Sequence, residues 1–392
     1  MSMSQLFVLV EFLVTKKICF VVSDPMTASS FLRLHFLYLS KKHDVTLIAN
    51  FSLRSYDKPD FLKVINVPIS RKVRVLNDIF CLFQLIFVFR RGGFDVVHSV
   101  TPKAGLLSMI AAFIVNIPFR FHTYTGQVWA NKTGFARFLY KLCDGIIFRL
   151  STFVLVDSSS QRTFLSESGV ISRRKSAVLA SGSISGVDLK RFAKDGTVRR
   201  KVRHEIGISE SSVMFLYIGR INKDKGIQDL VHAFSSLQLL DKDACLVIVG
   251  PDEGGVLNTI EKKVRSCGGN IYIKGYTDSP ESYMAASDVF CLPSYREGFG
   301  SVIIEAAACG VPALASRIYG ITDAVVEGET GLLHEAGNSS DIRAGMLKFI
   351  NDVDLTLRMG DLAYKRAHLF FDSHTVSGAL VDFYDKATKS NS

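Results

Sequence analysis

The stretch that most constrains the fold is Pro293–Pro312, P-S-Y-R-E-G-F-G-S-V-I-I-E-A-A-A-C-G-V-P. The apolar run Asp288–Leu292 before it is typical of a buried strand. A glycine loop, Gly298-Phe299-Gly300, then predicts the start of a helix near Ser301, and the later Gly-Val-Pro predicts its end. A helix that starts after a strand and a glycine loop presents free backbone amides and the positive end of its dipole. The stretch therefore predicts an anion-binding site.

Two glutamates, Glu297 and Glu305, flank that helix start with seven residues between them. A carboxylate beside a bound phosphate would be repelled, so we expect both to face neutral groups. Sugar hydroxyls fit, because an ionised carboxylate accepts hydrogen bonds from two adjacent hydroxyl groups. We expect Glu305 to bind the ribose of a nucleotide and Glu297 to bind hydroxyls of a transferred sugar. The alternative is an ordinary buried helix with two solvated glutamates.

The run from Glu297 to Pro312 resembles the Glu-x7-Glu signature of the retaining glycosyltransferases of family 4. The resemblance implies an α/β protein of the GT-B fold, with two facing, doubly wound Rossmann-like domains. It implies an acceptor-binding domain at residues 1–192, in which the apolar residues 1–15 are interpreted as an arm. A nucleotide-sugar-binding domain is expected at 193–368, followed by a helix at 369–392 that crosses back to the first domain.

Continuous apolar runs predict the same α/β organisation directly, because strands buried on both faces of a parallel sheet are apolar throughout. A helix expected at 29–41, between two such runs, predicts the βαβ start of a doubly wound domain. A further apolar helix is expected at 76–89, and helices at 355–386. The strands are expected at 18–22, 45–49, 64–67, 95–99, 119–123, 153–157, 213–218, 244–249, 270–274, 288–292 and 330–333.

Two polar residues of the first domain lie at the carboxyl ends of expected strands, which line the ligand crevice of an open α/β sheet. Lys103 follows one such strand and His122 lies at the end of another. The resemblance implies that His122 meets the transferred sugar, and Lys103 is a candidate for binding the acceptor. The run H-T-Y-T-G-Q-V-W-A from His122 is also similar to a subgroup that builds sugars on polyprenyl diphosphate. A histidine packed under a loop is the alternative.

The second domain contains candidate diphosphate-binding cations. Arg220 and Lys225 lie in G-R-I-N-K-D-K-G, which resembles the Gly-Arg…Lys-Gly motif of the family. A guanidinium binds two phosphate oxygens at once, and an ammonium acts as a point charge. The resemblance also implies that Gly275 and Tyr276 hold the nucleotide base. No Asp-x-Asp motif stands where a metal would hold the diphosphate. We therefore expect no metal and no other cofactor, and expect these cations and the loop amides to stabilise the leaving group.

Charge is distributed unevenly along the chain. Residues 1–200 contain 28 Lys and Arg against 12 Asp and Glu, whereas residues 201–392 contain 19 against 25. The basic half predicts an anionic partner, and the interleaved aromatic and basic motifs of a nucleic-acid binder are missing. The apolar helix at 76–89 has basic residues at both ends. This pattern predicts a helix buried on one side that contacts an anionic membrane, the alternative being a core helix with solvated ends.

The remaining patterns concern the compartment. Seven scattered cysteines without a Cys-x-x-Cys predict a reduced, cytoplasmic protein, bound peripherally to the inner face of the cell membrane. No apolar run is long enough to span a membrane. The apolar residues 6–14 lack a basic leader, so they are interpreted as an apolar arm or as the product of a start codon placed too early.

The resemblance and these patterns together imply a retaining glycosyltransferase. It would move a hexose or N-acetylhexosamine from a nucleoside diphosphate sugar, with UDP expected, to a polyprenyl-diphosphate-linked saccharide. The product would belong to O-antigen, capsule or exopolysaccharide synthesis. Two alternatives stay open: a sugar-nucleotide epimerase on the same fold, and a non-catalytic, membrane-associated nucleotide-binding protein.

Overall fold

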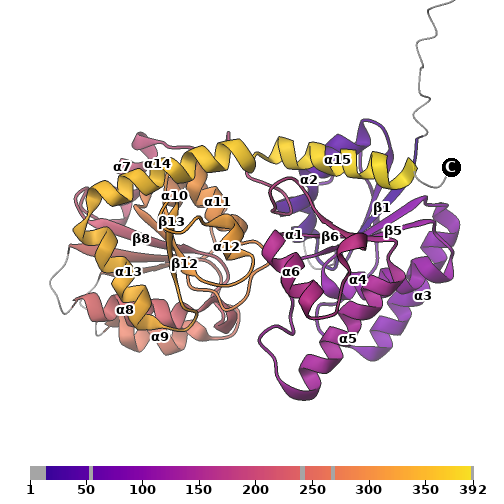
Figure 1. Ribbon diagram of the computed structural model, residues 1–392, viewed down its shortest axis with the longest axis horizontal. Helices are drawn as coiled ribbons and strands as arrows, with labels where there is room; N and C mark the ends of the chain where they lie inside the picture. Colours follow the sequence, from indigo (N-terminus) through magenta and orange to yellow (C-terminus); the bar gives the residue numbers. More distant parts are fainter. Residues whose placement is uncertain (1–14, 53–55, 239–242, 266–269, 390–392) are drawn as a thin grey trace, which may run out of the picture. The chain divides into compact units, whose positions relative to one another are not determined.

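The computed structural model describes residues 15–52, 56–238, 243–265 and 270–389 (Figure 1). The chain divides into two compact units. The first unit consists of the chain up to His122 together with the short segment Leu150–Thr152. The second unit consists of Thr123–Arg149 and of the chain from Phe153 on. Residues 1–14 of the predicted arm lie outside the described residues. The predicted boundaries at 192 and 368, and the return of the last helix, stay predictions.

The first sheet has seven strands in the order β3-β2-β1-β4-β5-β6-β7. The chain moves outward from β1 to β3 and then returns to the other side of β1, so β1 and β4 form the topological switch point. The strands are β1 (Lys17–Val21), β2 (Asp44–Ala49), β3 (Lys63–Asn66), β4 (Val96–Val100), β5 (Phe119–Tyr124), β6 (Phe153–Val156) and β7 (Ser176–Val178).

The second sheet has six parallel strands in the order β10-β9-β8-β11-β12-β13. The chain moves outward from β8 to β10 and then returns to the other side of β8, so the switch point of this sheet lies between β8 and β11. Nearly every side chain of β8 and β9 is buried, as expected for strands covered on both faces. The strands are β8 (Val213–Ile218), β9 (Ala244–Val249), β10 (Ile271–Lys274), β11 (Val289–Leu292), β12 (Ala313–Ser316) and β13 (Gly331–His334).

Helices cover both faces of the second sheet, with α8, α9 and α13 on one side and α7, α10, α11 and α14 on the other (Figure 1). The helices of the chain are α1 (Pro25–Thr27), α2 (Arg33–Ser40), α3 (Val75–Gly92), α4 (Pro102–Ile114), α5 (Gly134–Leu150), α6 (Ser159–Glu167), α7 (Gly196–Ile206), α8 (Ile227–Gln238), α9 (Val256–Arg265), α10 (Pro280–Ala286), α11 (Ser301–Ala308), α12 (Ile321–Ala324), α13 (Ser339–Asn351), α14 (Val353–Phe370) and α15 (Ser373–Lys389). A π-helical turn, η1 (Ala28–Leu32), and two 3-10 turns, η2 (Arg173–Lys175) and η3 (Lys223–Lys225), complete them.

The predicted strands are confirmed, with ends that shift by one or two residues. Strands β7 (S-A-V) and β12 (A-L-A-S) were not predicted, because neither contains a run of large apolar residues. The predicted helix at 29–41 begins earlier, at Pro25. Asp24 explains the difference, since its side chain accepts a hydrogen bond from Met26 N and caps the first turn.

Helix α3 corresponds to the apolar helix predicted at 76–89. One side of it is buried through Cys81, Leu85 and Phe89, as predicted. The opposite side is exposed and apolar along its length, and not only basic at its ends. The large exposed side chains of α3 are Val75, Leu76, Ile79, Phe80, Phe83 and Phe87. Among the described residues, no helix is long and apolar enough to cross a membrane.

Candidate active site

The switch point of the second sheet brings together two segments that are far apart in the sequence. Arg220 and Lys225 follow β8, and Glu297 follows β11, which pairs directly with β8. Ligands of open α/β sheets bind where the strand order reverses, beyond the carboxyl ends of the strands. The predicted cations and the loop glutamate therefore lie at the place where this fold binds ligands.

Gly226 makes the close approach of these two segments possible. Its φ is +66°, and a Cβ at this position would lie 2.0 Å from the carbonyl oxygen of Pro293. Any other residue would suffer both the strained backbone and the clash. Glycine lets the turn after β8 pack onto the start of the loop after β11, and this contact carries Lys225 to Glu297.

Lys225 and Glu297 form an ion pair, in which Lys225 Nζ donates to Glu297 Oε1. Ser294 Oγ donates to the same oxygen at 2.8 Å. The side chains of Lys225 and Glu297 are only 19 and 15% exposed, so water screens their charges weakly. Two residues that were predicted to contact different parts of a ligand thus contact each other.

Arg220 lies at the rim of the site. Its Nη1 donates to Glu253 Oε2 at 2.8 Å, and both side chains are more than two-fifths exposed. Exposed ion pairs contribute about 0–1 kcal/mol. The guanidinium can therefore leave Glu253 at little cost when a stronger anion is present.

The glycine loop between Glu297 and α11 is tightly packed. A Cβ on Gly298 would lie 2.7 Å from Asp157 Oδ2 and 2.8 Å from Gly126 N, so no side chain fits there. The Phe299 ring is buried and stacks edge-on against Phe371 at 5.3 Å between centroids. Gly300 precedes α11 with φ +76°. Backbone groups are thus what this loop can offer a ligand, as expected for an anion site at a helix start.

Glu305 lies in the second turn of α11. Burial raises the pKa of its carboxyl to about 7. The positive charge of Arg191 opposes this shift, and the negative charge of Glu281 reinforces it. Arg191 Nε in turn donates to Glu281 at 2.9 Å. A carboxyl with a pKa near neutrality changes its charge readily when a hydroxyl-bearing ligand approaches.

Asp157, directly after β6, is a buried carboxyl that the sequence analysis did not single out as a site residue. It is 6% exposed, and burial raises its pKa to about 8. Its Oδ1 is buried without a hydrogen-bond partner among the described residues, and its Oδ2 faces Gly298. The available signal was an aspartate that ends an apolar strand, V-L-V-D. Such a position marks the ligand side of a parallel sheet.

The residues predicted to hold the base follow β10. Gly275 is exposed, and its carbonyl accepts a hydrogen bond from Gly250 N at 3.1 Å, which fixes the turn after β9. Tyr276 is 60% exposed. Both lie at the carboxyl edge of the sheet that carries Arg220, and their contact with a base stays a prediction.

His122 and Lys103 belong to the first unit. His122 is buried, with Nδ1 2.8 Å from Ser99 Oγ, and burial lowers its pKa to about 3, so the ring is neutral. Lys103 forms an ion pair with Asp78 at 2.6 Å and donates to the carbonyl of Lys72. Lys103 thereby joins the first turn of α4 to that of α3. Roles in sugar and acceptor binding stay predictions for both residues.

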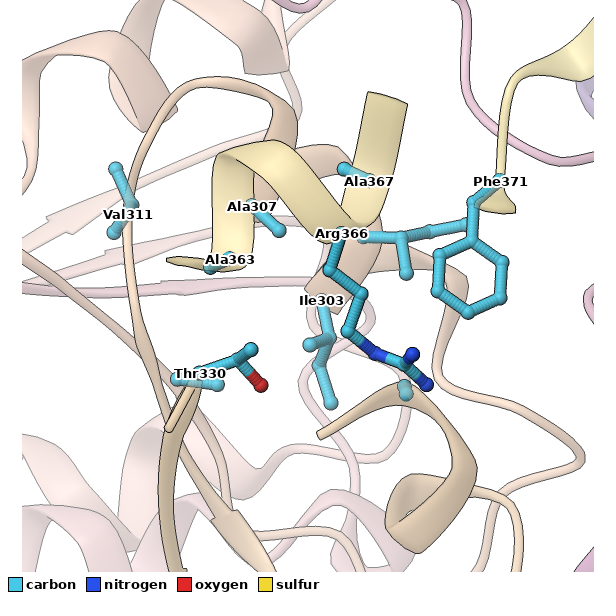
Figure 2. Close-up of a pocket in the computed structure, with 11 residues that line it drawn as sticks. Ile303, Ala307, Val311, Thr330, Ala363, Arg366, Ala367 and Phe371 are labelled. Carbon is cyan, nitrogen blue, oxygen red and sulfur yellow. The ribbon is translucent and has the colours of Figure 1, made fainter. Parts of the chain in front are cut away.

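A small pocket lies elsewhere in the second unit, between α11 and α14 (Figure 2). Ile303 and Ala307 of α11 and Ala363 and Ala367 of α14 line it with apolar groups. Arg366 is its charged lining residue and donates to the carbonyl of Asp323 at 2.6 Å. None of the predicted site residues lines this pocket, so we interpret it as a packing gap between the two helices.

The described residues include no group of three or more His, Cys, Asp and Glu side chains that could hold a metal ion. The expectation that the site works without metal stays a prediction.

Comparisons with known proteins match both halves of the chain. Residues 32–182 match the profile of "Glycosyltransferase Family 4", and residues 198–366 that of "Glycosyl transferases group 1". The capsular polysaccharide biosynthesis glycosyltransferase CapM of Staphylococcus aureus is 31% identical over 90% of this chain and 92% of its own.

Two more distant proteins extend the match. An Escherichia coli UDP-Gal:alpha-D-GlcNAc-diphosphoundecaprenol alpha-1,3-galactosyltransferase is 24% identical over 81% of this chain and 83% of its own. Among solved structures, Anabaena Alr3699/HepE, in complex with UDP and glucose, superposes with a TM-score of 0.77. That superposition has 17% identity and covers 95% of this chain and 100% of the other. The chain is therefore an enzyme of the GT-B fold that belongs to the family 4 glycosyltransferases.

Proposed function

We propose that this enzyme transfers a hexose or N-acetylhexosamine from a UDP-sugar, with retention, to a polyprenyl-diphosphate-linked saccharide. The observation that carries the donor half of the proposal is the Lys225–Glu297 pair at the switch point of the second sheet, beside the start of α11. This place combines a cation, a carboxylate and helix amides, which are the groups that a diphosphate and a sugar need. A protein of the same fold also binds UDP.

The ion pair suggests how the donor is accommodated. A diphosphate carries more charge than one carboxylate, so it would draw Lys225 away from Glu297. Glu297, held by Ser294, would then be free to accept hydrogen bonds from hydroxyls of the sugar. Arg220 would leave its exposed contact with Glu253 and bind the same diphosphate. Glu305 would bind the ribose.

The two cations and the backbone amides of the glycine loop would stabilise the diphosphate as it leaves, without a metal ion. Retention would follow if the acceptor hydroxyl attacks on the face from which the diphosphate departs, with a phosphate oxygen taking the proton. His122, buried and neutral, is the residue that the resemblance to the family assigns to the transferred sugar.

The acceptor is proposed from the names of relatives. The E. coli relative acts on a sugar linked to diphosphoundecaprenol, and CapM belongs to capsular polysaccharide biosynthesis. We therefore place this enzyme in the synthesis of a surface polysaccharide. A lipid-linked acceptor requires the enzyme to work at a membrane. The exposed apolar side of α3 and the basic Arg71, Arg74, Arg90 and Arg91 at its ends support peripheral binding to anionic lipid.

The test is an assay with a panel of UDP- and GDP-sugars, with and without a short-chain polyprenyl-diphosphate saccharide. We expect nucleotide release that depends on the acceptor, a product whose anomeric configuration by NMR matches that of the donor, and full activity in EDTA. An epimerase would instead change the sugar and keep the nucleotide attached. Lys225→Ala should abolish most activity, whereas Lys223→Ala, at an exposed lysine two residues away, is the matched control.

A further inference from the structure

Arg296, which immediately precedes Glu297, is a further cation at the candidate active site. Its side chain is only 21% exposed and contacts two segments besides its own loop. Nη2 donates to Asp224 Oδ2 at 2.9 Å, in the turn after β8. Nη1 donates to the carbonyl of Gly126 at 3.4 Å, in the segment after β5. One guanidinium therefore joins three segments that are far apart in the sequence.

The contact with Asp224 lies beside the ion pair of Lys225 and Glu297. Asp224 precedes Lys225 in one segment. Arg296 precedes Glu297 in the other, so two adjacent ion pairs join the same two segments. A backbone hydrogen bond of 2.9 Å, from Tyr295 N to the carbonyl of Asp224, fixes this register. The pairs differ in burial, because the Asp224 side chain is 54% exposed and both side chains of the other pair are largely buried.

The contact with Gly126 fixes the orientation of the guanidinium. A Cβ on Gly126 would lie 3.1 Å from Gly298 N and 3.2 Å from the carbonyl carbon of Glu297. The segment after β5 therefore packs directly on the peptide between these two residues. Because guanidinium donors are fixed in one plane, Arg296 makes its two contacts in a single orientation.

A donor would affect the two ion pairs differently, a step that rests on the proposed function. Its diphosphate would draw Lys225 away from Glu297 and so break the buried pair. Arg296 would stay in place, because an anion that took it would have to break both of its contacts. We propose that Arg296 is a positioning residue that acts through Asp224. It holds the turn that contains Lys225 against the loop that contains Glu297 when these two charges separate.

The first test separates the buried pair without a ligand. In the variant Lys225→Met/Glu297→Gln neither charge is left, so the segments rely on the contact of Arg296. Arg296→Ala should lower the Tm of wild type by less than about 3 °C, as expected for a partly exposed ion pair. It should lower the Tm of the neutral variant about twice as far or more. The matched control is Lys194→Ala, which removes an exposed ion pair of 2.7 Å with Asp361 and should lower the Tm equally in both backgrounds.

A second cycle tests whether Arg296 acts through Asp224. Asp224→Asn should reproduce the effect of Arg296→Ala in both backgrounds, and combining the two should add little to either. Because Asp224 is more than half exposed, its variant should fold even where Arg296→Ala does not. Arg296→Lys keeps the charge and should restore about half of the lost Tm or more. Equal Tm losses of Arg296→Ala in the two backgrounds, or additive losses in the second cycle, would overturn the proposal.

The consequence for transfer is measured with UDP and with the panel of sugar nucleotides. Arg296→Ala should change the Kd of UDP less than about threefold in titration calorimetry, because UDP carries no sugar for Glu297. It should lower kcat about tenfold or more, since both groups must face the donor from fixed positions. A merely structural role would instead reduce the fraction of protein that binds UDP. An unchanged kcat in this variant would also overturn the proposal. If wild type uses none of the sugar nucleotides, the proposed function fails, and the two Tm cycles still decide whether Arg296 holds the segments together.

Discussion

Replacing Asp157 by asparagine should stabilise the second unit, and more so as the pH rises. Burial raises the pKa of this carboxyl from 3.8 to about 8. Between these values the unfolded chain has lost a proton that the folded chain keeps. Stability therefore falls as the pH rises from about 4 to about 8, and the loss is complete above that. At pH 7 the pKa difference corresponds to a penalty of up to about 4 kcal/mol, at 1.36 kcal/mol per pH unit.

Asparagine has the shape of the neutral carboxyl and cannot ionise, so Asp157→Asn should remove this pH dependence. Urea unfolding followed by Trp129 fluorescence tests it, because Trp129 lies in the same unit. The stability difference between variant and wild type should be near zero at pH 4 and grow to several kcal/mol at pH 8. Asp57→Asn, at a side chain that is 90% exposed, is the control. A difference that does not change with pH, or a wild type that is the more stable at pH 8, would refute the reasoning.

Three further predictions concern the candidate active site. Lys225→Ala and Glu297→Ala should each lower kcat/KM at least tenfold, and their double variant should lose much less than the product of the two, as a double-mutant cycle would measure. Gly226→Ala should lower the free energy of unfolding by more than about 2 kcal/mol in thermal unfolding, because its Cβ would lie 2.0 Å from the Pro293 carbonyl oxygen. Because the pKa of Glu305 is about 7, its carboxylate gains a proton as the pH falls, and the donor KM of the wild type should rise below pH 7. Glu305→Gln should raise the donor KM about tenfold or more and abolish this pH dependence. A pH dependence that persists in the Gln variant would remove Glu305 from the donor site.

Most strands of the two sheets could be predicted because they contain apolar runs. β9, for example, reads A-C-L-V-I-V and is buried throughout. β12, A-L-A-S, could not, because its small residues have no distinct pattern and it becomes a strand by pairing with β11 and β13.

In the candidate site, too, local backbone features could be predicted and side-chain contacts could not. The glycine loop and the start of α11 follow from local residues, because Gly300 needs a positive φ that glycine allows. The partners of individual side chains depend on tertiary packing. Lys103 was expected to face an acceptor, and in the fold it contacts Asp78, 25 residues earlier in the chain. Spacing in the sequence cannot indicate such a contact between helices.

The Lys225–Glu297 pair is the contact that most needs a functional explanation. Both side chains are largely buried, and removing two charges from water costs several kcal/mol, which their attraction only partly offsets. Apolar residues of similar volume would fill this space at lower cost. Other residues position the pair. Gly226 packs on Pro293 and so brings the two segments together, and Ser294 donates a hydrogen bond to the Glu297 carboxylate. Stability alone does not favour this charged pair, which lies beyond the carboxyl ends of β8 and β11 at the switch point of the sheet. A ligand that binds both charges explains it best. A nucleoside diphosphate sugar, with an anionic and a hydroxylated part, has the two groups that this pair would separate to bind.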